Sequence, residues 1–206
     1  MPATSVDTVA AQLDVPTGQG RSTAWWGMVM TILTEGTLFA MLLFVYYYLF
    51  SRASTWPLGD IEPPELLIVS IRTVLLFASS ATMSITDRAI QRGRTGLASA
   101  FMAVTFVLGV VFMAGHVEEM LRLPEEFTWA TNAYGSLFYV IVNFHGAHLL
   151  IGLVILAFSY VALRRGRYTA DHHEGLKVTG MYWHFVDVVW VLVYPTLYLV
   201  PHLLAK

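Results

Sequence analysis

Long apolar runs separated by short polar segments dominate this chain. Five runs of at least 19 residues are rich in Leu, Val, Phe, Ala and Met, and they cover 25–50, 66–86, 97–115, 134–163 and 178–204. A helix that crosses a hydrocarbon core of ~30 Å needs about 20 mostly apolar residues. The runs show no strand-type alternation, and lipid requires backbone groups to be paired within their own segment. The pattern predicts an all-α fold: a polytopic membrane bundle of five transmembrane helices.

The first 24 residues have a different character. They are small and polar, with Asp7, Asp14 and Pro16, and they lack the basic start and short apolar core of a secretory signal. We therefore expect a flexible tail over 1–24 and a five-helix transmembrane domain over 25–206.

Basic residues are unevenly shared between the two sets of connecting segments. Arg21 and the segments after the second and fourth runs hold eight Lys and Arg residues, whereas the opposite set holds three, with Lys206 included. Because cytoplasmic segments carry the Lys and Arg excess, we expect a cytoplasmic N-terminus and a periplasmic C-terminus in a bacterial cytoplasmic membrane. Trp25 and Trp26 are then expected at the inner interface, and another aromatic group at or near the outer one, formed by Tyr46, Tyr47, Tyr48, Trp56 and Trp129.

Composition excludes several classes of protein. Of 206 residues, 56% are hydrophobic and only 13% charged, against about 25% charged in a soluble domain. A net charge of −2 argues against a nucleic-acid partner. The absence of cysteine excludes disulfide scaffolds, iron–sulfur clusters, thiolate zinc sites and cysteine nucleophiles.

Ionisable residues inside the predicted spans are the candidate functional residues. A charge at the bilayer centre costs at least ~2.5–3.5 kcal/mol on insertion scales, so each should face protein or water, or be neutral. Glu35 follows Trp25 by ten residues and Asp187 follows Val178 by nine, which puts both carboxyl groups near mid-membrane at ~1.5 Å per residue. Residues three apart share a helix face. The simplest arrangement is one buried polar seam, formed by Glu35, His145, His148, His184 and Asp187.

Three interpretations of this seam remain open. It can be a set of interhelical hydrogen bonds that only holds register, a proton-handling or site-shaping group, or a metal or haem site. Haem needs axial histidines that face each other across the bundle, which His145 and His148 on one helix face do not offer. No H-E-x-x-H zinc motif is present. A carboxylate beside an imidazole can form either an ion pair or a neutral hydrogen-bonded pair.

Three further residues form a possible lipid or outer-face site. Arg72 lies seven residues beyond Glu65, and it can snorkel toward the headgroups, bind a lipid phosphate, or pair with Glu118 or Glu119. His116 and Glu119 share a helix face. The simpler interpretation is that they cap the third helix at the interface.

Several motifs resemble one known family. Five stretches resemble, in order along the chain, segments of subunit III of the haem–copper terminal oxidases. They are Thr34-Glu35-Gly36-Thr37-Leu38-Phe39, residues 73–80, residues 133–139, Phe144-His145-Gly146-Ala147-His148, and Tyr182-Trp183-His184-Phe185-Val186-Asp187-Val188-Val189-Trp190. The resemblance implies a short five-helix form that lacks the two extra N-terminal helices of longer members.

The same resemblance carries functional expectations. It implies a subunit without catalytic residues, cofactor or metal of its own, which packs against the haem- and copper-containing catalytic subunit I and other oxidase subunits. Structural phospholipids are expected in a cleft between helix groups. Such subunits support proton uptake and stability of the catalytic core during O2 reduction to water.

The chain also departs from the family pattern. The third span ends in His116-Val117-Glu118-Glu119-Met120 where the family usually has Gln-x-x-Glu-Tyr, and Arg72 replaces a small polar residue. Pro195 should bend the last span because it removes one backbone hydrogen bond.

Other functions remain possible at this stage. They are an accessory subunit of nitric oxide reductase or of a quinol-oxidising terminal oxidase, a free-standing proton channel or transporter, and a haem-binding membrane anchor. The sequence does not identify the electron donor.

Overall fold

The chain folds into helices joined by short connections. The computed structural model describes residues 21–59, 61–62 and 64–203. Its elements are α2 Thr23–Arg52, α3 Leu66–Gln91, α4 Thr95–Arg122, the 3-10 helix η1 Leu123–Glu125, α5 Ala133–Arg164, α6 Glu174–Tyr194, the π-helix η2 Pro195–Leu199 and α7 Val200–Leu203. Most of the expected N-terminal tail, residues 1–20, and Lys206 lie outside the described residues.

Five helical segments are long and apolar enough to cross a membrane, and the described residues contain no strand. The all-α expectation is therefore confirmed. Two helices run past their predicted C-terminal ends by more than one turn: α3 continues from Thr86 to Gln91, and α4 from Gly115 to Arg122. The apolar pattern stops at Thr86 and Gly115, but polar residues such as Asp87 and Glu118 are compatible with helix and continue it.

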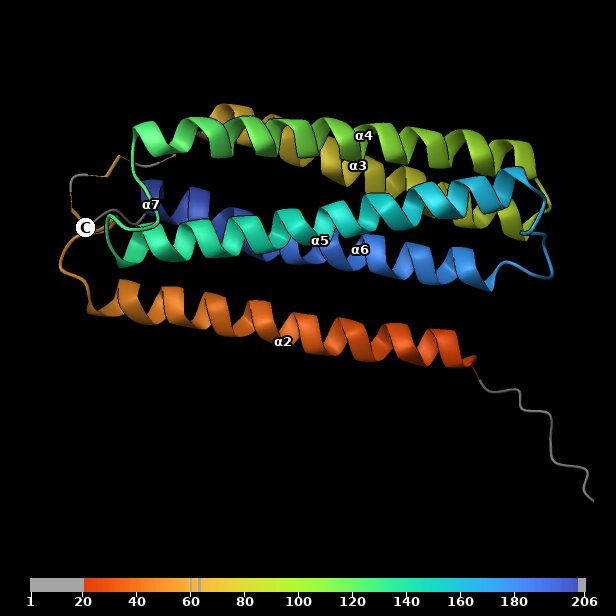
Figure 1. Cartoon of the computed structure of the whole chain (residues 1–206), viewed down its shortest axis with the longest axis horizontal. Helices are drawn as coiled ribbons and strands as arrows, with labels where there is room; N and C mark the ends of the chain where they lie inside the picture. Colours follow the sequence, from red (N-terminus) through yellow and green to blue (C-terminus); the bar gives the residue numbers. More distant parts are fainter. Residues whose placement is uncertain (1–20, 60, 63, 204–206) are drawn as a thin grey trace, which may run out of the picture.

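The helices run side by side along the long axis of the molecule (Figure 1). The most extensive contact between two helices is that of α3 with α4, and α5 packs against both α4 and α6. Helix α2 lies along one edge and contacts α6 and α5. All five spans have large apolar residues on their outer surfaces, including Leu33, Val74, Val107, Phe158 and Val188, as expected for helices that face lipid.

The segment between α2 and α3 folds back onto the bundle. Trp56 is buried, its Nε1 donates to the hydroxyl of Tyr46 at 3.0 Å, and its ring packs edge-on against Tyr46 and Tyr134. Asn132 caps α5 by accepting from the Gly135 N–H at 2.9 Å, and its amide donates to the Leu58 carbonyl at 2.7 Å. Tyr46 and Trp56 therefore anchor this segment to the core, and their position near the outer membrane interface stays a prediction.

Pro195 changes the helix type. It has no N–H to donate, and the backbone widens into the π-helix η2 over the five residues Pro195–Leu199 before α7 begins. Single-turn π segments are rare and shift the phase of the residues that follow. In this chain the π-helix lies inside the bundle, because its residues Thr196, Leu197 and Tyr198 are all buried.

Candidate functional site

Glu35 and His148 join α2 to α5. The Nε2 atom of His148 lies 3.2 Å from Oε2 of Glu35. The other ring nitrogen, Nδ1, lies 2.7 Å from the carbonyl oxygen of Phe144, one helical turn earlier. Because a carbonyl only accepts, Nδ1 carries a hydrogen and Nε2 is left to face the carboxyl group.

The contact between the two side chains is compatible with two arrangements of hydrogen. Either Nε2 donates to a carboxylate as an imidazolium, or it accepts from a protonated carboxyl group, and the contact is the same in both states. The side chain of His148 is 11% exposed and that of Glu35 is 38% exposed. The pair is therefore not sealed in the core, and Glu35 opens onto the surface of the bundle.

His145 lies one turn from His148 but in different surroundings. It is 1% exposed, and neither ring nitrogen has a hydrogen-bond partner among the described residues. Its ring lies 4.7 Å from that of Trp190, centroid to centroid, and edge-on to Phe39 and Phe112. The surroundings of His145 are thus largely aromatic.

His184 and Asp187 face α3. Nδ1 of His184 lies 2.6 Å from Oγ of Ser80, and Nε2 lies 3.5 Å from Oγ of Ser84. Asp187 is 5% exposed, and its carboxyl group lies beside the hydroxyl of Ser80, although neither oxygen forms a well-aligned hydrogen bond among the described residues. The cluster belongs to the α3–α6 contact, apart from the Glu35–His148 pair.

The five residues of the predicted polar seam are thus only partly brought together. One direct polar contact joins two of them, Glu35 and His148, whereas His184 bonds to serines of α3. The ring of Phe185 packs edge-on to His148 at 6.4 Å, centroid to centroid, beside the pair. In the part of the chain that the structure describes, no group of three or more His, Asp and Glu side chains is positioned to hold a metal ion.

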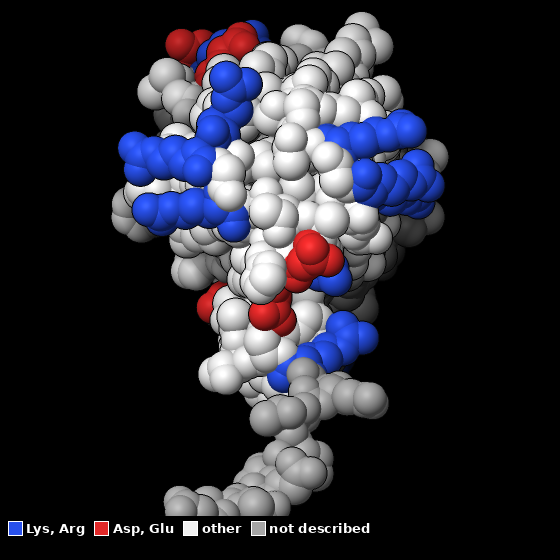
Figure 2. Space-filling view, turned by 90° about the vertical axis from the view of Figure 1, so that its right-hand side faces the viewer, with Lys and Arg blue, Asp and Glu red and all other residues white. Residues whose placement is uncertain are grey.

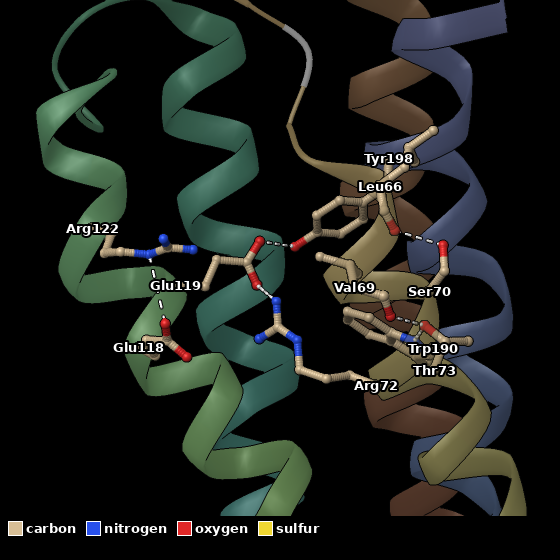
Figure 3. A network of polar contacts seen from close by, with 10 residues as sticks. All are labelled: Leu66, Val69, Ser70, Arg72, Thr73, Glu118, Glu119, Arg122, Trp190 and Tyr198. Carbon is tan, nitrogen blue, oxygen red and sulfur yellow. Dashed lines mark hydrogen bonds and ion pairs between the residues drawn. The ribbon is translucent and has the colours of Figure 1, made fainter.

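Glu119 is the centre of a second polar network, in which it joins Arg72 of α3 and Tyr198 of η2 to α4 (Figure 3). Nη2 of Arg72 donates to Oε2 of Glu119 at 3.0 Å, and the hydroxyl of Tyr198 donates to Oε1 of the same carboxylate at 2.9 Å. The side chains of Arg72 and Glu119 are 13% and 15% exposed. The sequence left three interpretations of Arg72 open, and the structure shows one of them, the ion pair with Glu119.

Two glycines make room for this network. A Cβ atom at Gly115 would overlap the Arg72 side chain, and one at Gly146 would overlap the ring of His116. His116 is buried against α5 in this way, and α4 continues past it to Arg122. The interpretation of His116 and Glu119 as a helix cap is therefore wrong, because the helix does not end there.

Several residues of these sites carried no signal in the sequence. Ser80, Ser84 and Tyr198 are not among the candidate residues of the sequence, although they contact His184 and Glu119 in the structure. The spacing of Ser80 and Ser84, four apart on one helix face, is the one cue that could have pointed to a partner for His184.

Comparison with known proteins finds similarity along nearly the whole chain. Residues 15–201 match the sequence profile of a family described as cytochrome c oxidase subunit III. A Thermostichus vulcanus protein named cytochrome c oxidase subunit 3 is 33% identical over 174 residues, which are 84% of this chain and 85% of the relative.

Relatives from distant organisms align over a similar range. The Synechocystis protein of the same name is 31% identical over 175 residues, covering 84% of this chain and 74% of the relative. The Danio rerio protein, also of that name, is 34% identical over 180 residues, covering 84% of this chain and 68% of the relative. The similarity therefore extends across all five spans.

Proposed function

The chain belongs to the cytochrome c oxidase subunit III family, and on this premise we propose that it stabilises the catalytic subunit and supports proton uptake during O2 reduction. It is subunit III of a cytochrome c oxidase and an integral membrane protein. An accessory role in nitric oxide reductase or in a quinol oxidase is not favoured, because the relatives carry the cytochrome c oxidase name.

We assign the redox chemistry to partner subunits. Haem and copper belong, in this proposal, to catalytic subunit I, and this chain contributes no catalytic residue. The directions of its histidines support the assignment: His148 faces Glu35 and His184 faces Ser80, whereas axial haem ligands face each other across a bundle.

The Glu35–His148 contact carries the mechanistic part of the proposal. A carboxyl group and an imidazole within hydrogen-bond distance can exchange one proton without moving either helix. The partial exposure of Glu35 leaves that proton accessible from the surface of α2, where a partner subunit or lipid can lie. The pair is suited to hold a proton near the catalytic subunit rather than to conduct it through this chain.

The charge distribution supports an orientation. Lys and Arg side chains crowd the end of the bundle at which α2 begins (Figure 2), and they are Arg21, Arg88, Arg92, Arg94, Arg164, Arg165, Arg167 and Lys177. We call this the basic end. By the positive-inside rule it faces the cytoplasm of a bacterial cell, so the N-terminus is inside and the C-terminus is periplasmic. Structural phospholipids complete the surface of the bundle.

Purification of the complex tests the subunit role. An affinity-tagged chain, extracted in mild detergent, should co-purify with a haem-containing protein that consumes O2 with reduced cytochrome c. Consumption of NO instead of O2, or isolation of the chain alone from membranes that contain active oxidase, would contradict it.

A further inference from the structure

A basic hollow lies at the turn between α3 and α4, at the basic end of the bundle. Its volume is about 170 Å³, and it is lined by Ile85, Arg88, Ala89, Arg92, Arg94 and Leu97. Three of its six lining residues are arginines, and none is acidic. Arg88, Arg92 and Arg94 are all exposed.

These three arginines lack a counter-charge within the described part of the chain. None of their guanidinium groups takes part in an ion pair or a hydrogen bond there. The neighbouring acid, Asp87, accepts from Nε2 of Gln91 at 2.7 Å instead. Like charges gathered around one hollow repel each other, so a bound anion would stabilise the turn.

The start of α4 adds to the positive potential. This helix of 28 residues has Arg94 at its N-cap, without a side-chain cap hydrogen bond and without an acid in the first turn. The first N–H groups of a helix carry a partial positive charge and favour anions. In most helices an Asp, Ser or Thr side chain supplies that negative partner, and here the position holds another cation.

The apolar part of the hollow indicates the kind of anion. Ile85 and Leu97 supply apolar lining, and along α4 from Leu97, which is 40% exposed, apolar residues remain exposed through Val104, at 45%. A free phosphate ion would leave this apolar lining without a contact. We propose that the hollow binds the phosphate group of an anionic phospholipid, with the acyl chains lying along α3 and α4.

This site belongs to the chain itself and does not depend on its role in an oxidase. Basic pockets between membrane helices recognise anionic headgroups, and each Lys or Arg near the surface contributes about 1 kcal/mol. Arginine also offers its planar fork to two phosphate oxygens at once. Loss of two arginines should therefore weaken binding about thirtyfold.

Native mass spectrometry of the full-length chain in mild detergent tests the proposal. The delipidated chain is titrated with phosphatidylglycerol and, separately, with phosphatidylcholine. We expect tighter binding of phosphatidylglycerol, and about thirtyfold weaker binding in the variant Arg92→Gln/Arg94→Gln. The matched control, Arg165→Gln/Arg167→Gln, removes two charges from the neighbouring turn and should bind like the wild type.

Three outcomes would overturn the assignment. Equal affinities for the two lipids in the wild-type chain would do so without any variant, so misfolding of a variant leaves the test intact. Equal loss in the two double variants would show that only total charge matters. Displacement of phosphatidylglycerol by millimolar inorganic phosphate would make the hollow a site for a soluble anion.

Discussion

The side chain of Arg72 crosses α4 at Gly115, where any Cβ atom would overlap it. Gly115→Ala must displace either the arginine, and with it the ion pair to Glu119, or the whole of α3. Overpacking of this kind costs about 1–3 kcal/mol. We expect a lower unfolding midpoint for this variant in detergent, measured by intrinsic tryptophan fluorescence on heating.

Gly96 of the same helix provides the control. A Cβ atom there meets no atom within 4 Å, so Gly96→Ala should leave the midpoint unchanged or raise it slightly, because alanine favours helix by up to about 1 kcal/mol. Equal midpoints for the two variants would show that Arg72 moves aside at no cost.

The Arg72–Glu119 ion pair should be strongly coupled. Glu119→Gln leaves a largely buried guanidinium without its counter-charge, and breaking such a pair costs about 3 kcal/mol. Replacing both residues, Arg72→Met with Glu119→Gln, should recover part of that loss. A double-mutant cycle on the free energy of unfolding should give a coupling energy of at least about 1 kcal/mol.

An exposed ion pair within α4, formed by Arg122 and Glu118, is the reference for the coupling energy of the buried pair. Arg122 and Glu118 lie 3.8 Å apart with side chains 59% and 64% exposed, so Arg122→Gln should cost about 0–1 kcal/mol. A coupling energy near zero for Arg72 and Glu119 would make their contact equivalent to this surface pair.

The fold was largely accessible from the sequence, because the requirement for about 20 apolar residues per span is severe and leaves few alternatives. What hydropathy cannot give is where a helix ends. The residues from His116 to Arg122 are polar but still helical, so α4 extends beyond the predicted end at Gly115. The burial of Trp56 was equally hidden, since an aromatic residue near a span end has the same pattern in either place.

The candidate site was accessible only in part. The cost of a charge in lipid singled out Glu35, His148, Arg72 and Asp187 without any structure. Their pairing depends on how each helix is rotated, which packing decides, so one predicted polar seam became an α2–α5 pair and an α3–α6 cluster. Tyr198 reaches Glu119 from within the π-helix at Pro195, a backbone change that helical periodicity does not anticipate.

Asp187 should tolerate loss of its charge. Its carboxyl group lies beside Ser80 but forms no well-aligned hydrogen bond in the described chain, so Asp187→Asn removes no strong hydrogen bond and keeps the shape of the side chain. We expect the free energy of unfolding of the full-length chain to change by less than about 1 kcal/mol, measured by chemical denaturation in mixed micelles. A loss as large as that of Glu119→Gln would show that the carboxylate itself is needed at this position, through Ser80 or through a partner outside the described residues.

The Glu35–His148 pair should act as a unit in turnover. Glu35→Gln keeps a hydrogen-bonding side chain beside Nε2 of His148 but removes the carboxyl group that can accept or release a proton. We therefore expect normal assembly and haem content of the purified oxidase, with a faster decline of O2 consumption during sustained turnover. Proton uptake, followed with a pH indicator dye, should slow in parallel.

The double variant of Glu35 and His148 gives the stricter test of whether the two groups act together. If the two groups share one proton, His148→Gln should give the same phenotype as Glu35→Gln, and the double variant should be no worse than either. Thr37→Ala is the matched control, because its hydroxyl donates to Leu33 of its own helix at 2.8 Å and is exposed on α2. Wild-type inactivation kinetics in Glu35→Gln would exclude a proton-handling role and leave the contact a purely structural link between α2 and α5.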